Sequence, residues 1–274
     1  MLSHFSWRAK GRLLSLIGLS RYAACLEFGN DLVLRLPPWR KRIEGNLRRV
    51  RSFQGLPTSA DDVQRHRGAL AALHAEIQAT LALFASVPSP PILDEVELPL
   101  LPALRRLGAA GRGVLLAAPH YGNLWLCAKA LDRAGVPLAC VLNDPAPYRW
   151  GETPTLRVLP RRGSSRACLG VLRRNRCVLL TADMSFDAKA PRHPFFGYAV
   201  SSPRNVVRLS ALAGSPILPV CAVRRGGRWS FECRAGIDPR SAGRGAMEED
   251  LLRSMESFVA ADPSQWLLLH DAWR

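Results

Sequence analysis

The residue best suited to acid–base chemistry is His120, in the run Pro119, His120, Tyr121, Gly122 and Asn123. This run follows a short apolar stretch and opens a helical pattern. Functional side chains in open α/β sheets gather where strands end, and an imidazole can act as a general base near neutral pH. Gly122 allows a tight bend or close approach of a substrate. Asn123 suits a substrate contact or a helix cap, so on these residues alone His120 is a catalytic candidate with a structural alternative.

The elements that must position His120 alternate between apolar runs and helical patterns. Short apolar runs bounded by Gly or Pro predict buried strands, and apolar residues at helical spacing predict the helices between them. The predicted strands cover 113–118, 138–142, 177–181, 217–223 and 229–233, and the predicted helices cover 123–134, 165–175, 204–213 and 247–260. Such alternation is typical of an α/β fold with a mostly parallel central sheet flanked by helices.

The first third of the chain has a different character. Residues 1–90 predict a basic helical N-terminal segment, which ends in a Pro-rich linker, and residues 91–274 form the α/β core, the two making one integrated domain. One helix is predicted to start at Asp61 or Asp62 and to run to about residue 85. Residues 13–19 suit an amphipathic surface helix or a core-packing first helix rather than a signal peptide.

The strongly positive net charge of the chain favours an anionic partner. The chain has 38 Lys and Arg against 22 Asp and Glu, a formal net charge of +16. Nucleic acid, an anionic membrane and an acidic protein would all be attracted to it, but no helix-turn-helix, zinc-finger or aromatic-basic RNA motif is present. No stretch of about 18 uncharged apolar residues predicts a transmembrane helix. Seven cysteines without a CxxC pair indicate buried thiols rather than a disulfide framework or a zinc site.

Several short motifs, in order, resemble one family. His120-Tyr121-Gly122-Asn123 is similar to the His-x-Gly-Asn-Trp-Glu motif of the bacterial lipid A biosynthesis acyltransferases, which belong to the wider lysophospholipid acyltransferase group. Thr181-Ala182-Asp183 resembles a strand-end Ala-Asp-Gln, and Pro194-Phe195-Phe196-Gly197 matches a Phe-Phe-Gly motif. Residues 208–220 and 263–274 are similar to a Gly-Ala-x-Val-x-Pro segment and to a Pro-x-Gln-Trp-x-x-x-His-x-x-Trp ending. The N-terminal third is only loosely similar.

The resemblance implies a concrete activity. Such an enzyme moves an acyl group from a thioester, on acyl carrier protein or coenzyme A, to a lipid hydroxyl at the membrane. The histidine removes the acceptor proton, and an acidic residue orients the histidine. The resemblance implies no metal, no cofactor and no covalent enzyme intermediate. It also implies a peripheral place at the inner face of a bacterial cytoplasmic membrane, where an acidic carrier protein and anionic lipid would meet the basic surface.

The chain departs from this pattern at the acidic partner. The family motif places a carboxylate five positions after the histidine, and Trp125 stands there. Three explanations are open. Another carboxylate approaches His120 in the fold, with Asp183 and Asp144 as candidates because both follow predicted strand ends. Alternatively, the acceptor is an amine, which needs less base assistance than an alcohol. The third explanation is a catalytically silent relative that acts as a carrier-protein or lipid-binding scaffold.

Other residues are candidates for substrate contacts through the same resemblance. Arg162 precedes the predicted helix at 165–175, where a phosphate could bind beside the helix N-terminus. Arg192 and Arg204 flank the Phe-Phe-Gly motif as possible anion contacts, and Phe195, Phe196 and Gly197 could border an acyl channel, with core packing as the alternative for both rings. We do not expect His4, His66, His74, His193 or His270 to be catalytic.

Overall fold

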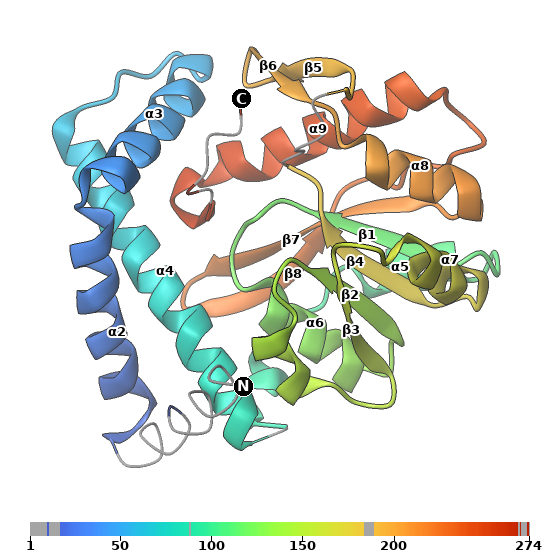
Figure 1. The fold of residues 1–274 in the computed structure, drawn as a ribbon, viewed down its shortest axis with the longest axis horizontal. Helices are drawn as coiled ribbons and strands as arrows, with labels where there is room; N and C mark the ends of the chain where they lie inside the picture. The colour runs from blue at the N-terminus through green and yellow to red at the C-terminus, as the bar shows by residue number, and fades with distance from the viewer. Residues whose placement is uncertain are drawn as a thin grey trace.

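The protein folds around a six-stranded sheet, seen in the computed structural model that describes residues 10, 17–87, 89–183, 189–267, 269 and 273 (Figure 1). The strand order is β3-β2-β4-β1-β7-β8, and β8 runs antiparallel to β7 while the other neighbours are parallel. The strands are β1 (Val114–Ala118), β2 (Leu138–Leu142), β3 (Leu156–Pro160), β4 (Cys177–Thr181), β7 (Ile217–Arg225) and β8 (Arg228–Cys233). The predicted α/β fold with a mostly parallel sheet is confirmed.

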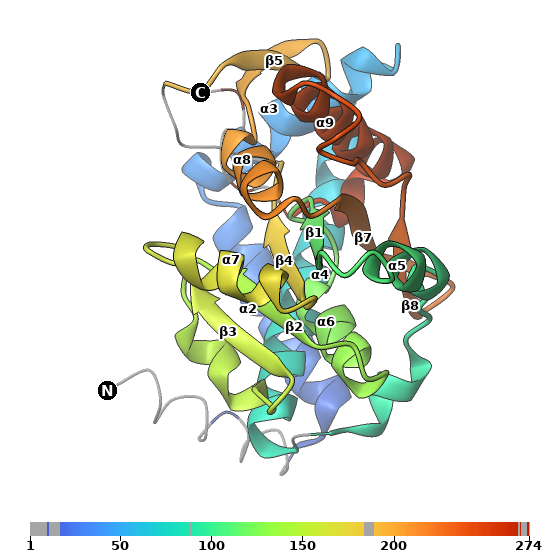
Figure 2. The ribbon, with the colours of Figure 1, turned by 90° about the vertical axis from the view of Figure 1, so that its right-hand side faces the viewer.

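Helices cover both faces of the sheet, so the central strands are apolar throughout (Figure 2). All five residues of β1 are buried, as expected for a parallel strand packed on two sides. One face packs against α7 (Ser165–Arg173), α8 (Arg204–Ala213) and α9 (Arg244–Ala261). The other packs against α4 (Ala60–Ser86), α5 (Leu101–Gly108), α6 (Leu124–Arg133) and the short 3₁₀ turn η1 (Pro91–Glu95).

The N-terminal helices form a layer beside the sheet. The helices α2 (Leu19–Leu34) and α3 (Pro37–Phe53) both contact α4 and lie at the left of Figure 1. α4 starts two to three residues before the predicted start at Asp61 or Asp62: Ser59 is the N-cap, and the Asp62 carboxylate accepts from the Ser59 backbone N–H at 2.9 Å. The reason is a capping box, in which the N-cap hydroxyl and the third helical residue satisfy each other's open N–H groups. Asp61 and Asp62 therefore lie inside the first turn.

α4 also bears on the membrane prediction. It is long and apolar enough, by length and composition, to cross a bilayer. Half of its most apolar window is buried inside the protein, however, because α4 packs on α2 and contributes to the hydrophobic core of the sheet. A core helix meets the same criterion, and α4 joins the N-terminal layer to the sheet. Most of residues 13–19, where the amphipathic helix is predicted, lies outside the described residues.

A two-stranded hairpin lies over α9. β5 (Arg192–Phe195) and β6 (Tyr198–Ser201) pair antiparallel, and two residues, Phe196 and Gly197, form the turn. Both have positive φ, 51° and 75°, which is the geometry of the tightest hairpin turns. The shorter connections η2 (Ala146–Gly151) and η3 (Pro263–Gln265) complete the described elements.

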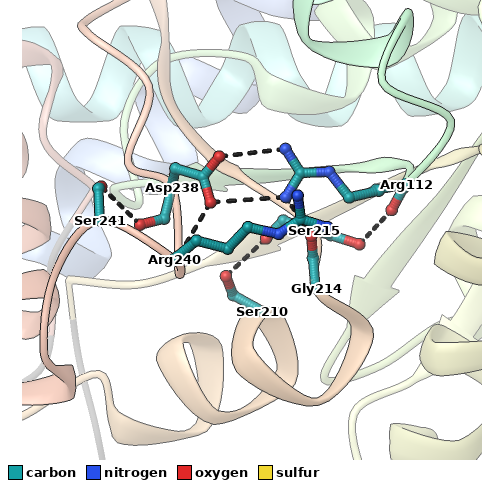
Figure 3. Close-up of polar contacts among 7 residues, drawn as sticks. All are labelled: Arg112, Ser210, Gly214, Ser215, Asp238, Arg240 and Ser241. Atoms are coloured by element: carbon teal, nitrogen blue, oxygen red, sulfur yellow. Dashed lines mark hydrogen bonds and ion pairs between the residues drawn. The ribbon is translucent and has the colours of Figure 1, made fainter.

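A polar network closes the edge of the sheet at which β1 and β7 begin (Figure 3). Arg112 binds the Asp238 carboxylate at 3.1 Å and the Gly214 carbonyl at 2.8 Å. The Ser215 hydroxyl donates to the Arg112 carbonyl, and the Ser210 hydroxyl donates to the Ser215 carbonyl at 2.6 Å. These bonds join the end of α8 to the start of β1. They lie at the opposite end of the strands from His120.

Candidate active site

His120 and Asp183 meet at the carboxyl edge of the sheet. β1 and β4 are adjacent, parallel and in register, with Ala118 opposite Thr181. Each strand is followed two residues later by one member of the pair, so His120 and Asp183 emerge side by side. The distance from His120 Nδ1 to Asp183 Oδ1 is 2.6 Å, and the backbone N–H of His120 donates to Asp183 Oδ2 at 2.9 Å. Such a carboxylate can orient the ring of a histidine base.

A tryptophan from the end of the chain completes the support of Asp183. The indole Nε1–H of Trp266 donates to Asp183 Oδ2 at 2.8 Å. Residues 265–267 run against 120–122, since the Gly122 N–H donates to the Gln265 carbonyl at 2.9 Å and the Leu267 N–H donates to the His120 carbonyl at 2.7 Å. The Asp183 side chain is fully buried, so three N–H groups take the place of water around it.

The burial of the pair sets its charges. Burial lowers the pKa of His120, but the negative charge of Asp183 and the hydrogen bond to it raise that pKa more, and the net pKa lies above its ordinary value of 6.5. Burial likewise raises the pKa of Asp183, while the charge of His120 and the bonds from His120 and Trp266 lower it below 3.8 overall. At neutral pH the carboxyl is therefore ionised, as an orienting partner must be.

The free edge of the imidazole faces outward. The His120 side chain is 38% exposed, whereas its partner is not exposed at all. The Asp183 carboxylate accepts a hydrogen bond from Nδ1–H of His120. In the neutral ring the proton therefore stays on Nδ1, and Nε2 carries the free lone pair. No described residue donates to Nε2 or accepts from it. The arrangement can thus accept a proton from a bound molecule at Nε2.

The other residues of the motif support the backbone. Gly122 has φ +61°, and a Cβ there would lie 1.9 Å from the Ala222 carbonyl oxygen, so the glycine lets the chain approach β7. Asn123 is fully buried; its Oδ1 accepts from the Leu126 N–H and its Nδ2 donates to Thr80, each at 3.1 Å. Asn123 therefore acts as the helix cap and has no exposed surface through which the predicted substrate contact could act.

The second carboxylate candidate is not part of this site. Asp144 is exposed after β2, and its Oδ1 accepts from the Ala146 N–H at 3.2 Å in a local turn. β2 is separated from β1 by β4, so Asp144 makes no contact with His120. Trp125, at the position of the missing acid, is buried and packs edge to face on Tyr148 with ring centroids 5.2 Å apart.

The basic residues predicted near the site are spread over the protein. Arg162 is exposed in the turn after β3, and it is the neighbouring Arg161 whose positive charge acts on His120. Arg192 donates to the Ala199 carbonyl at 2.6 Å within the hairpin. Arg204 lies at the start of α8 and lines a separate cleft. Arg161 was missed because only proximity in the fold distinguishes it from Arg162.

The Phe-Phe-Gly residues form part of the core. Phe195 and Phe196 are buried, with ring centroids 4.7 Å apart, and both pack near Trp266. They therefore support the tryptophan that holds Asp183, and a channel wall for an acyl chain remains a prediction. Among the other histidines, His193 bonds to Glu248 at 3.0 Å, while His4 and His270 lie outside the described residues. No group of three His, Cys, Asp or Glu side chains that could hold a metal ion occurs in the described part of the chain.

Comparison with known proteins decides the family. Residues 94–274 match the family described as bacterial lipid A biosynthesis acyltransferase. The chain belongs to this family. A phosphatidylinositol mannoside acyltransferase of Mycobacterium tuberculosis is 29% identical over 180 residues, covering 60% of this chain and 56% of its own length. The protein of the same name from Mycolicibacterium smegmatis is 27% identical over 175 residues, covering 60% and 58%. The chain thus spans somewhat more than half the length of the curated relatives it matches.

Proposed function

We propose that this protein transfers an acyl group from a thioester to a lipid-like acceptor, with His120 as the general base and Asp183 as the residue that orients it. The observation that carries the proposal is the 2.6 Å contact between His120 Nδ1 and Asp183 Oδ1 at the carboxyl edge of the sheet. Family membership gives the reaction class, and the pair gives the groups that perform it.

The proposed step uses one proton carrier. His120 Nε2 takes the proton of the acceptor group as its oxygen attacks the thioester carbonyl carbon. The resulting tetrahedral intermediate collapses, the carbon–sulfur bond breaks, and the thiolate leaves with the proton that His120 had taken. The positive imidazolium that forms in between is stabilised by the Asp183 carboxylate. The step needs neither a metal nor a covalent enzyme intermediate.

Asp183 supports the first of the three explanations for Trp125. Asp183, which follows the neighbouring strand β4, takes the place of the carboxylate that the family motif has five positions after the histidine. The amine-acceptor explanation loses its motive, because the base has an acidic partner. We therefore propose a hydroxyl acceptor. The curated relatives are named for phosphatidylinositol mannoside, a lipid that carries sugar hydroxyls, and a hydroxyl-bearing lipid is the acceptor class we propose here.

A membrane location is supported by the outer side of the N-terminal helices. Phe28, Leu32, Val33 and Leu36, on α2 and just after it, are between 48% and 70% exposed, which is unusual for such large apolar side chains in a row. The exposed cations Arg40 and Lys41 follow in α3. An apolar stripe beside cations is typical of a surface that rests on anionic lipid. We propose that this α2–α3 face holds the protein peripherally on the inner face of the cytoplasmic membrane.

The donor is proposed to be a thioester of acyl carrier protein or coenzyme A. Both are anionic, and the formal net charge of +16 would attract either one. The alternative is a scaffold that binds a carrier protein or lipid without turnover. Such a scaffold would not require a histidine hydrogen-bonded to an ionised carboxylate that accepts from three N–H groups.

Purified protein tests the proposal. Wild type and His120→Ala are incubated with acyl-loaded carrier protein or acyl-coenzyme A and a hydroxyl-bearing lipid in detergent, and acylated product is measured by mass spectrometry. We expect product with wild type and at least a 10³-fold lower rate with His120→Ala. Equal rates would remove His120 from the mechanism. Binding of the acylated carrier protein without any transfer by wild type would favour the scaffold.

A further inference from the structure

A hollow lies between α8, α9 and the start of the hairpin, away from His120. Its volume is about 650 Å³, within the usual range of small-molecule sites. Its lining includes four cationic side chains, contributed by Lys189, Arg204, Arg208 and Arg244. This basic cleft contains neither member of the His120–Asp183 pair. Of the elements around it, α9 contacts both α8 and β5, and all three lie toward the upper right of Figure 1.

Within the described part of the chain, the arginines of the basic cleft have no anionic partner. Arg204, Arg208 and Arg244 form no ion pair or hydrogen bond with any described side chain. The nearby Arg112, by contrast, is paired with Asp238 at 3.1 Å. Arg204 and Arg208 also stand one helical turn apart, where like charges destabilise a helix. An anion placed between them would remove that repulsion.

The carboxylate in the lining does not neutralise these arginines. Glu248 is 4% exposed and bonds to His193 Nε2 at 3.0 Å, so its charge is directed to the hairpin. The N-cap of α9 is Gly243, which has no side chain to satisfy the first N–H groups of that helix. Open N–H groups and the helix dipole add to the positive field of the cleft. Guanidinium groups in such a field favour phosphate, whose oxygens match their paired donors.

The cleft extends away from the catalytic pair. Asp262 follows α9 and its carbonyl accepts from the Tyr121 hydroxyl at 2.9 Å, beside His120. Arg244 begins the same helix, whose 18 residues span about 27 Å. The near end of the cleft stays within reach of the pair, because Lys189 is six residues beyond Asp183 and their Cα atoms are at most about 21 Å apart. A ligand that fills the cleft and also reaches His120 must therefore be extended, with its charged end far from its reacting end.

We propose that the basic cleft binds the phosphate ester end of an extended substrate, with Arg204, Arg208 and Arg244 as phosphate contacts. Two substrates of the proposed reaction have this chemistry: a coenzyme A donor and a phospholipid acceptor. The restriction to these two ligands rests on the proposed acyl transfer. The existence of a phosphate site does not depend on it.

Isothermal titration with the His120→Ala protein tests the site without turnover. The probes are coenzyme A, glycerophosphoinositol and inorganic pyrophosphate. We expect saturable binding that weakens with salt, and about a tenfold or larger loss in Arg208→Ala, because a charge-assisted bond to phosphate is removed. Arg204→Ala gives a second, independent variant. The matched control is Arg228→Ala, a 75% exposed arginine at the start of β8, for which we expect less than about a twofold change.

The tightest probe identifies the source of the phosphate. Tighter binding of coenzyme A assigns the cleft to the donor, and tighter binding of glycerophosphoinositol assigns it to the acceptor; either outcome supports a phosphate site. Absence of saturable binding, or an equal loss in Arg208→Ala and Arg228→Ala, overturns it. Because His120→Ala carries no catalysis in the proposed mechanism, these results are independent of whether the transfer assay succeeds.

Discussion

Replacing Asp183 with asparagine changes the chemistry of the site while keeping its shape. In the native site the Asp183 Oδ2 atom accepts two hydrogen bonds, from the His120 backbone N–H at 2.9 Å and from Trp266 Nε1–H at 2.8 Å. Both partners are donors, so the amide oxygen of an asparagine must take that position. Its NH₂ group then faces His120 Nδ1, where the second carboxylate oxygen stood at 2.6 Å.

That orientation imposes the wrong tautomer on the histidine. An amide NH₂ can only donate, so Nδ1 must accept and the ring proton moves to Nε2. A protonated Nε2 cannot take the proton of the acceptor hydroxyl. In a serine protease triad the corresponding change lowers kcat about 10⁴-fold, which equals about 5 kcal/mol of transition-state stabilisation. We expect a loss of the same order in Asp183→Asn.

The assay is transfer of a radiolabelled acyl group from its thioester to lipid in detergent, followed under single-turnover conditions. The control is Asp144→Asn, an exposed carboxylate in a turn after β2, which should keep the wild-type rate. Thermal unfolding of Asp183→Asn checks the fold, with an expected loss of about 1–3 kcal/mol because hydrogen bonds to a charged acceptor become neutral ones. A folded Asp183→Asn protein with a rate within about threefold of wild type would refute the tautomer argument.

Three further results are expected. The logarithm of kcat/KM should rise with pH through the pKa of His120, which lies above 6.5, because the neutral ring is the base; a flat profile from about pH 5.5 to 9 contradicts this. Gly122→Ala should lower the free energy of unfolding in urea by about 3 kcal/mol or more, because the added Cβ meets a β7 carbonyl. Gly135→Ala, where φ is positive but the space is open, should lower it by only about 1–2 kcal/mol. Equal losses would reject the close approach at Gly122. Phe28→Ser should weaken binding to anionic vesicles about tenfold or more. The control Val87→Ser, at a 43% exposed position just after α4, should not weaken it, and equal binding by both variants would exclude the α2–α3 face.

Much of the sheet could be predicted because its central strands are short and apolar. The runs at 114–118 and 177–181 are apolar almost throughout, as strands covered on both faces must be. β3 was missed because it is an edge strand of mixed burial that contains Arg157 and ends at Pro160. The hairpin was missed because Phe196, and not Asn or Gly, takes the first left-handed position of its turn.

The sequence could predict His120 and two candidate carboxylates, but not which of the two is its partner. The sequence placed Asp183 and Asp144 at strand ends, but it does not contain the order of strands in the sheet. The observed order puts β4 beside β1 and leaves β2 one strand further away, which selects Asp183. The role of Trp266 was not predictable either, because its 2.8 Å bond to Asp183 joins residues 83 positions apart.

The most direct test of the account is a double-mutant cycle on the pair. Asp183→Asn is measured in the wild-type background and again in His120→Ala, with the same single-turnover assay. If Asp183 acts through His120, the substitution lowers the rate about 10⁴-fold in the first background and leaves it unchanged in the second. Losses that multiply, so that the double variant is slower than His120→Ala by the full Asp183→Asn factor, would show that the two residues act separately and would contradict the proposed mechanism.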